Sequence, residues 1–261
     1  MARETRRPPF SGPAFTRLLA ALNDAPASAS TDAFAQRLSG WFDWTDAISL
    51  SAALNSPPTH VPGIGVTGAA HLDEREFVRV RATLSKLAAQ ASATTVETAA
   101  KARPARHATV RITAAPIAPD EFPPYRERHV AFQQAMETAI AALRRRVRAT
   151  LAGASPELAR LADLDAVLEQ VVGEQERVLL SSLSGRLEQR FEHLRRAHAG
   201  HADASEPSSE HSPDEAARER TAWTDTFRRE MHDVLLAELE LRLQPVEGLL
   251  EALRASLPVS P

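Results

Sequence analysis

The first candidate for chemistry in this chain is a glycine motif near the end of its first quarter. Residues 63–68 read Gly-Ile-Gly-Val-Thr-Gly, which matches G-x-G-x-x-G, the spacing that brings backbone close to a pyrophosphate. The motif works between a strand and a helix, but here it follows Ser56-Pro57-Pro58, where no strand pattern occurs. We therefore interpret residues 55–70 as a flexible Pro/Gly loop and expect no cofactor.

The histidines form a second candidate, as metal ligands. His193, His198 and His201 lie close together in the sequence, with His211 beyond them. A step of five residues does not place two side chains on one helix face, and no H-E-x-x-H motif is present. We expect solvated histidines and no metal site.

Nucleophilic catalysis has equally little support in the sequence. Ser181, Ser182 and Ser184 fall inside a predicted helix, with no elbow motif and no assignable base. The chain has no cysteine, which excludes a thiol nucleophile and a disulfide. These observations predict a protein that is not an enzyme.

Four arginines form the most basic cluster: Arg144, Arg145, Arg146 and Arg148. They could hold phosphates of nucleic acid or lipid, which is one interpretation. The other is that they pair, within or between chains, with the acidic final helix, which carries Glu238, Glu240, Glu247 and Glu251. The net charge of −3 argues against nucleic acid as the partner, and we expect the basic and acidic helices to face each other.

The longest regular pattern runs from Ser155 to about residue 199. Ser155 is an N-cap residue and Pro156 suits the first helical position. A rod of this length spans roughly 60 Å and needs partners to cover its apolar stripe. Gln175 and Glu176 interrupt the stripe, which is typical of a residue pair that sets register. The stripe contains Leu161, Leu168, Val172, Leu179, Leu183, Leu187 and Leu194.

Two more long helices are predicted around this rod. One covers residues 125–152, with an apolar face of Phe132, Met136, Ile140, Leu143, Val147 and Leu151, and the turn after it is short enough for an antiparallel αα-hairpin. The other begins near Pro213, after a mobile loop at 199–213, and should kink at Pro245. We predict a long-helix coiled-coil bundle over residues 125–257.

The N-terminal part reads as a separate unit. Residues 1–10 are a disordered arm, residues 11–98 a small aromatic-rich helical module, and residues 99–124 a Pro-rich linker. The module contains Trp41, Phe42 and Trp44, which pack in a core or dock on a partner. Its last helix is predicted from about residue 72 to residue 98.

These patterns together predict an all-α, elongated protein. No stretch approaches 18 apolar residues and the first ten residues lack a secretory core, so we expect a cytoplasmic protein with no transmembrane segment. We expect a scaffold or adaptor that binds a protein partner or forms a homo-oligomer. Its predicted partner-binding residues are Trp41, Phe42, Trp44, Leu179, Leu183 and Leu187.

The N-terminal stretches 10–19 (Phe-Ser-Gly-Pro-Ala-Phe-Thr-Arg-Leu-Leu) and 37–50 (Arg-Leu-Ser-Gly-Trp-Phe-Asp-Trp-Thr-Asp-Ala-Ile-Ser-Leu) carry a resemblance. The chain resembles an uncharacterised bacterial family, domain of unknown function three-three-four-eight. The resemblance implies no known activity. It also suggests neighbouring genes for stator-like and OmpA-like envelope proteins, and hence an accessory to a cell-envelope assembly.

Overall fold

The fold was analysed in a computed structural model, which describes Phe15, Leu18, Leu19 and residues 44–58, 66–93, 121–204 and 213–256. Every regular element in these ranges is an α-helix, so the predicted all-α class is confirmed. The helices are α3 (Trp44–Asn55), α4 (Val66–Ser92), α5 (Pro123–Ala154), α6 (Pro156–Ser181), α7 (Leu183–Ala204) and α8 (Pro213–Ser256).

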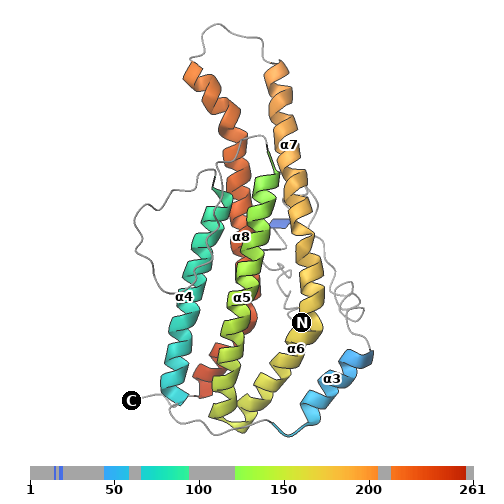
Figure 1. The fold of residues 1–261 in the computed structure, drawn as a ribbon, viewed down its shortest axis with the longest axis vertical. Helices are drawn as coiled ribbons and strands as arrows, with labels where there is room; N and C mark the ends of the chain where they lie inside the picture. Colours follow the sequence, from blue (N-terminus) through green and yellow to red (C-terminus); the bar gives the residue numbers. More distant parts are fainter. Residues whose placement is uncertain are drawn as a thin grey trace, which may run out of the picture.

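The long helices form an elongated bundle (Figure 1). α5 runs down, α6 and α7 return along it, and α8 runs the full length, while α4 packs against α5 and α8. The short α3 packs against α6. α8 has 44 residues and continues as helix through Pro245.

The hairpin between α5 and α6 forms as predicted. Ser155 is extended, and its side chain accepts a hydrogen bond from the Leu158 N–H at 3.2 Å, with Pro156 at the first helical position. All six residues of the predicted apolar face of α5 are buried: Phe132, Met136, Ile140, Leu143, Val147 and Leu151. The cap and the 3.6-residue period are local signals, which explains why the sequence reveals them.

An aromatic cluster holds together the start of α5, the middle of α7 and α8. Phe191 is the centre of this cluster, with its ring centroid 5.0 Å from those of Trp223 and Phe227 and 5.6 Å from that of Phe122. Tyr125 lies against Phe227 at 5.2 Å in an edge-to-face arrangement. Such tilted contacts are favourable beyond the area that the rings bury.

The predicted separation of an N-terminal module from the bundle does not hold at α4. This helix contributes Phe77, Leu84, Ala88 and Ala91 to the same core as α5 and α8. It also begins at Val66 and ends at Ser92, so Gly68 of the glycine motif lies in its first turn rather than in a loop. Apolar periodicity identifies the buried face of a helix but not the helix that covers it. The prolines between the two segments suggested a domain boundary, whereas α4 packs directly against α5 and α8.

The predicted rod forms as two consecutive helices, α6 and α7, with a one-residue irregularity at Ser182, whose backbone keeps helical dihedral angles (φ −67°, ψ −16°). The predicted start of the loop at residue 199 is wrong, because α7 extends to Ala204. Alanine at several of these positions favours helix. The arm at 1–10, residues 99–120 of the linker, Gly63, Gly65 and residues 205–212 lie outside the described residues.

Candidate functional site

A buried polar cluster joins α5, α7 and α8 close to Ser182. His129 Nδ1 lies 2.8 Å from Ser184 Oγ, and His129 Nε2 lies 3.3 Å from Glu238 Oε2. His129 and Glu238 are almost completely buried, at 1% and 0% side-chain exposure. Buried polar groups need such partners, because a group that is buried without one loses the hydrogen bonds that water would otherwise supply.

Glu238 has two further partners that complete its environment. Gln133 Nε2 donates to Glu238 Oε1 at 2.9 Å, and Arg242 lies 3.2 Å from the same oxygen. Burial alone would raise the pKa of Glu238, but the hydrogen bond and charge of His129, the charge of Arg242 and the Gln133 hydrogen bond outweigh it. The pKa of Glu238 is therefore lowered, and the carboxylate is held in its ionised form.

The carbonyls just before Ser182 accept additional hydrogen bonds from side chains. The Ser182 hydroxyl donates to the Leu179 carbonyl at 2.6 Å, and the Ser181 hydroxyl donates to the Val178 carbonyl at 2.8 Å. Gln133 donates to the Leu180 carbonyl at 3.3 Å. Because Gln133 also donates to Glu238, it links α6 at Leu180 to α8.

Ser184, His129 and Glu238 are connected in the order found in serine nucleophile triads. The sequence offers no recognisable base for Ser184, because its partners are distant along the chain. His129 lies 55 residues before Ser184, and Glu238 lies 109 residues after His129. His129 and Glu238 are almost completely closed to solvent, so the contacts of this cluster connect α5, α7 and α8 inside the bundle.

The arginine cluster meets carboxylates within its own chain. Arg144 binds Asp165 of α6 through two hydrogen bonds, at 2.6 and 2.8 Å, and Arg148 lies 2.6 Å from Glu169. Arg146 lies 2.6 Å from Asp73 of α4. The pairing interpretation thus places its partners on α6 and α4, not on the final helix that we had expected.

The acidic residues of α8 have other partners. Glu240 and Glu247 both pair with Arg81 of α4, at 2.7 and 3.7 Å. Arg145 alone among the four clustered arginines has no ion pair within the described residues, and it is exposed. The anion-binding alternative therefore has a cost. Of its residues Arg144, Arg145, Arg146 and Arg148, three would have to release a carboxylate that they already contact in order to bind an anion.

The residues predicted to bind a partner separate into two groups. Leu183 and Leu187 are buried in the bundle, with 2% and 1% exposure, so they pack within their own chain. Leu179 is 50% exposed and Trp44 is 82% exposed. Trp41 and Phe42 lie outside the described residues.

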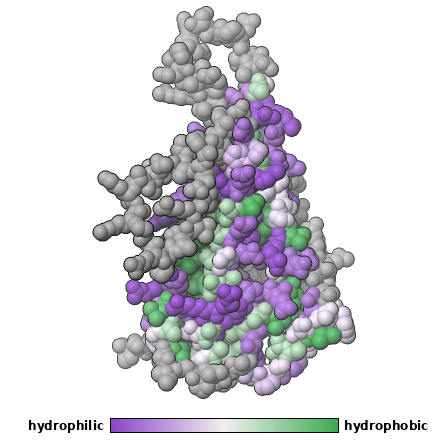
Figure 2. Space-filling model, in the orientation of Figure 1, coloured by the Kyte–Doolittle hydropathy of each residue, from purple (hydrophilic) through white to green (hydrophobic). Residues whose placement is uncertain are grey.

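Exposed apolar side chains gather on α3 and the second half of α6. They are Trp44, Ile48, Leu54, Leu168, Val178 and Leu179. Figure 2 shows hydrophobic surface at the lower right, where Figure 1 places α3. Scattered apolar side chains are ordinary on a protein surface, whereas adjacent ones indicate an interaction site.

Two of the histidines considered as metal ligands, His193 and His198, lie on α7. Among the described residues, no group of three or more His, Asp or Glu side chains could hold a metal ion. His211 and the side chain of His201 lie outside that description. In the same described part of the chain, no helix is both long and apolar enough to cross a bilayer.

The fold and these surfaces define an all-α, long-helix bundle protein with a buried polar cluster. The chain belongs to the family described as Protein of unknown function (DUF3348), whose model matches residues 1–255. This match confirms the family resemblance seen in the N-terminal stretches. The chain matches no curated protein and no solved structure.

Proposed function

We propose that this protein is a non-enzymatic scaffold that self-associates through the exposed face of α6. The observation that carries the proposal is the uncovered apolar stripe on this helix, which includes Leu168, Val178 and Leu179 at 36%, 60% and 50% exposure. A face of this kind on a rigid bundle suits a helix–helix contact.

The stripe has a symmetric spacing about one polar residue. Val172 and Val178 lie three residues on either side of Gln175, and Val171 and Leu179 lie four residues on either side. Steps of three and four keep all five positions on one helix face. Two antiparallel copies centred on Gln175 would therefore place Val178 beside Val171 of the second copy, and Leu179 beside Val172.

Gln175 at the centre favours one register for this pairing. It is exposed, and its amide can both donate to and accept from its own copy across a two-fold axis. A polar residue in an apolar seam costs stability and selects register. An isologous contact of this kind closes as a dimer and does not extend into a fibre.

The chain is free of cysteine, so a single Gln175→Cys substitution tests the axis directly. Two copies of this residue on the axis should form an intermolecular disulfide under mild oxidation, because bridged Cβ atoms lie only about 4 Å apart. Gln170→Cys is the matched control, since residue 170 is also exposed but lies five positions away, on another face of α6. Equal cross-linking of both variants, or of neither, would contradict the proposed axis.

Leu179→Asp tests the same interface in solution. A charge in the seam should convert a dimer to a monomer in multi-angle light scattering, while the circular dichroism spectrum stays unchanged. Leu183→Asp separates folding from association, because Leu183 is buried within its own chain and its substitution should unfold the bundle. A wild-type protein that is monomeric at high concentration would contradict self-association. The protein would then act as an adaptor for a different protein partner, which affinity capture from the native host would reveal.

A further inference from the structure

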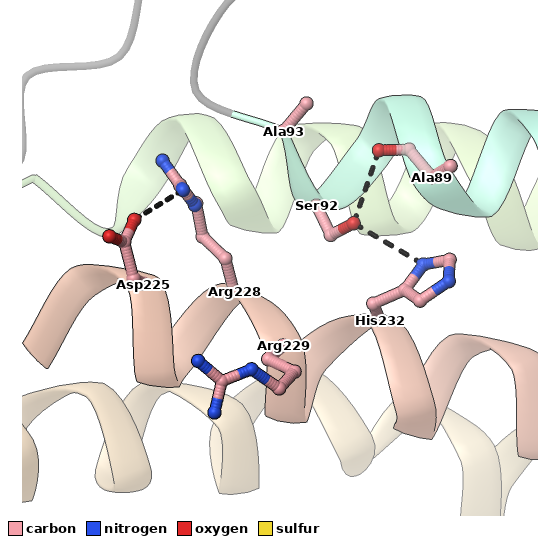
Figure 3. Close-up of a pocket in the computed structure, with 7 residues that line it drawn as sticks. All are labelled: Ala89, Ser92, Ala93, Asp225, Arg228, Arg229 and His232. Atoms are coloured by element: carbon pink, nitrogen blue, oxygen red, sulfur yellow. Dashed lines mark hydrogen bonds and ion pairs between the residues drawn. The ribbon is translucent and has the colours of Figure 1, made fainter. Parts of the chain in front are cut away.

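A shallow groove runs between α4 and α8, away from α6. Two adjoining hollows form it, and both are lined by Ala89 and His232. Small residues of α4 and the residue after it make one wall, namely Ser85, Ala89, Ser92 and Ala93. Figure 3 shows the first hollow, with Ser92 facing His232 across it at 3.5 Å, Ser92 Oγ to His232 Nδ1.

The groove is basic, although the protein is acidic. Its lining includes four basic side chains, Arg81, Lys86, Arg228 and Arg229, against two carboxylates, Asp225 and Glu240. The difference is +2, in a chain whose net charge is −3. Local charge of this sign concentrates anions at the surface.

The two carboxylates are already engaged. Glu240 lies 2.7 Å from Arg81, and Asp225 pairs with Arg228 one turn along α8. Lys86 and Arg229 are exposed, and neither has an ion pair with any carboxylate in the described ranges. The positive charge available to a ligand therefore comes from these two side chains.

The lining between them is partly apolar, with His232 in both hollows. Ala89, Leu236 and Ala237 line the second hollow beside Lys86, and Arg229 lines the first hollow. Eight positions separate Arg229 from Ala237, which is about 12 Å along the helix axis. An extended peptide covers that distance in about four residues.

From this arrangement we propose that the α4–α8 groove binds an acidic peptide segment of a protein partner. Carboxylates at the two ends of a short segment reach Lys86 and Arg229, and small apolar side chains between them lie on Ala89 and Leu236. The open shape of the groove suits an extended chain and does not enclose a small solute. This surface is distinct from the α6 face, so the inference does not depend on self-association.

The test uses the full-length protein and a fluorescein-labelled peptide in which two pairs of glutamates flank a Leu-Ala-Leu centre. Fluorescence polarisation at low salt should show saturable binding that weakens as salt rises. Lys86→Glu and Arg229→Glu should each weaken binding by more than about tenfold, because each places like charge opposite a glutamate. The same peptide with lysine in place of glutamate should not bind.

Arg145→Glu is the control variant, because Arg145 is also an exposed, unpaired arginine in the described chain but lies on α5 outside the groove. Its peptide affinity should equal that of the wild type. An equal loss in this variant would overturn the proposal and reveal general charge attraction. Displacement of the peptide by inorganic phosphate or by single-stranded RNA at lower concentration than by unlabelled peptide would also overturn it, in favour of phosphate recognition.

Discussion

His129 Nε2 and Glu238 Oε2 lie 3.3 Å apart in the centre of the bundle, on helices separated by 109 residues of sequence. Both side chains are withdrawn from solvent, and Arg242 also lies 3.2 Å from the Glu238 carboxylate. A pair of this kind is costly to bury and still more costly to break. This contact fixes the register of α5 against α8, and the contact of His129 with Ser184 adds α7.

Glu238→Ala should destabilise the protein strongly. Removing the carboxylate leaves His129, Gln133 and Arg242 without their shared acceptor, at an expected cost of about 3–5 kcal/mol in the free energy of unfolding by urea. Glu240→Ala, two residues along the same helix, removes an exposed pair with Arg81 and should cost at most about 1 kcal/mol. Similar losses in the two variants would contradict the assigned importance of the buried cluster.

Stability should also fall at acidic pH through Glu238. Its folded-state pKa is lowered, so its contribution is complete above the ordinary glutamate range and is lost as pH falls through the folded pKa. We expect the free energy of unfolding of the wild type to approach that of Glu238→Gln below about pH 5. A difference between the two proteins that stays constant from neutral pH to pH 3 would show that Glu238 is not the titrating group.

Phe191→Ala should open the aromatic cluster. This ring is fully buried and contacts four other rings, so its removal should cost about 3–5 kcal/mol in thermal or urea unfolding. Trp44→Ala is the comparison, because Trp44 is 82% exposed and its removal should change monomer stability by about 0.5 kcal/mol or less. A larger effect at Trp44 would mean that α3 is more deeply packed than its exposure indicates.

Asp165→Ala should loosen the α5–α6 hairpin. Asp165 is 10% exposed at its side chain and accepts hydrogen bonds from Arg144 and Arg148, so the expected cost is about 2–3 kcal/mol. Hydrogen exchange should rise first in the facing turns of α5 and α6. Arg145→Ala, in the same basic cluster but exposed, should leave both exchange and stability unchanged.

The helices themselves were predictable because their signals are local. Ser155 with Pro156, and the apolar face of α5 from Phe132 to Leu151, appear within a few turns of chain and do not depend on any distant residue. The same local reasoning located the arginine cluster and its need for carboxylate partners. It could not choose between α8 and the actual partners, Asp165 and Asp73, because charge alone does not specify position.

The sequence by itself therefore determined the all-α class, the αα-hairpin and most of the apolar faces of the long helices. Tertiary structure decided that α4 joins the bundle, and that Leu179 faces out while Leu183 faces in. The physical reason is that periodicity specifies which side of a helix is apolar, whereas only packing specifies what covers it. The contacts of His129 with Ser184 and Glu238 were likewise decided by the tertiary structure, since they exist only where three helices that are distant in sequence meet.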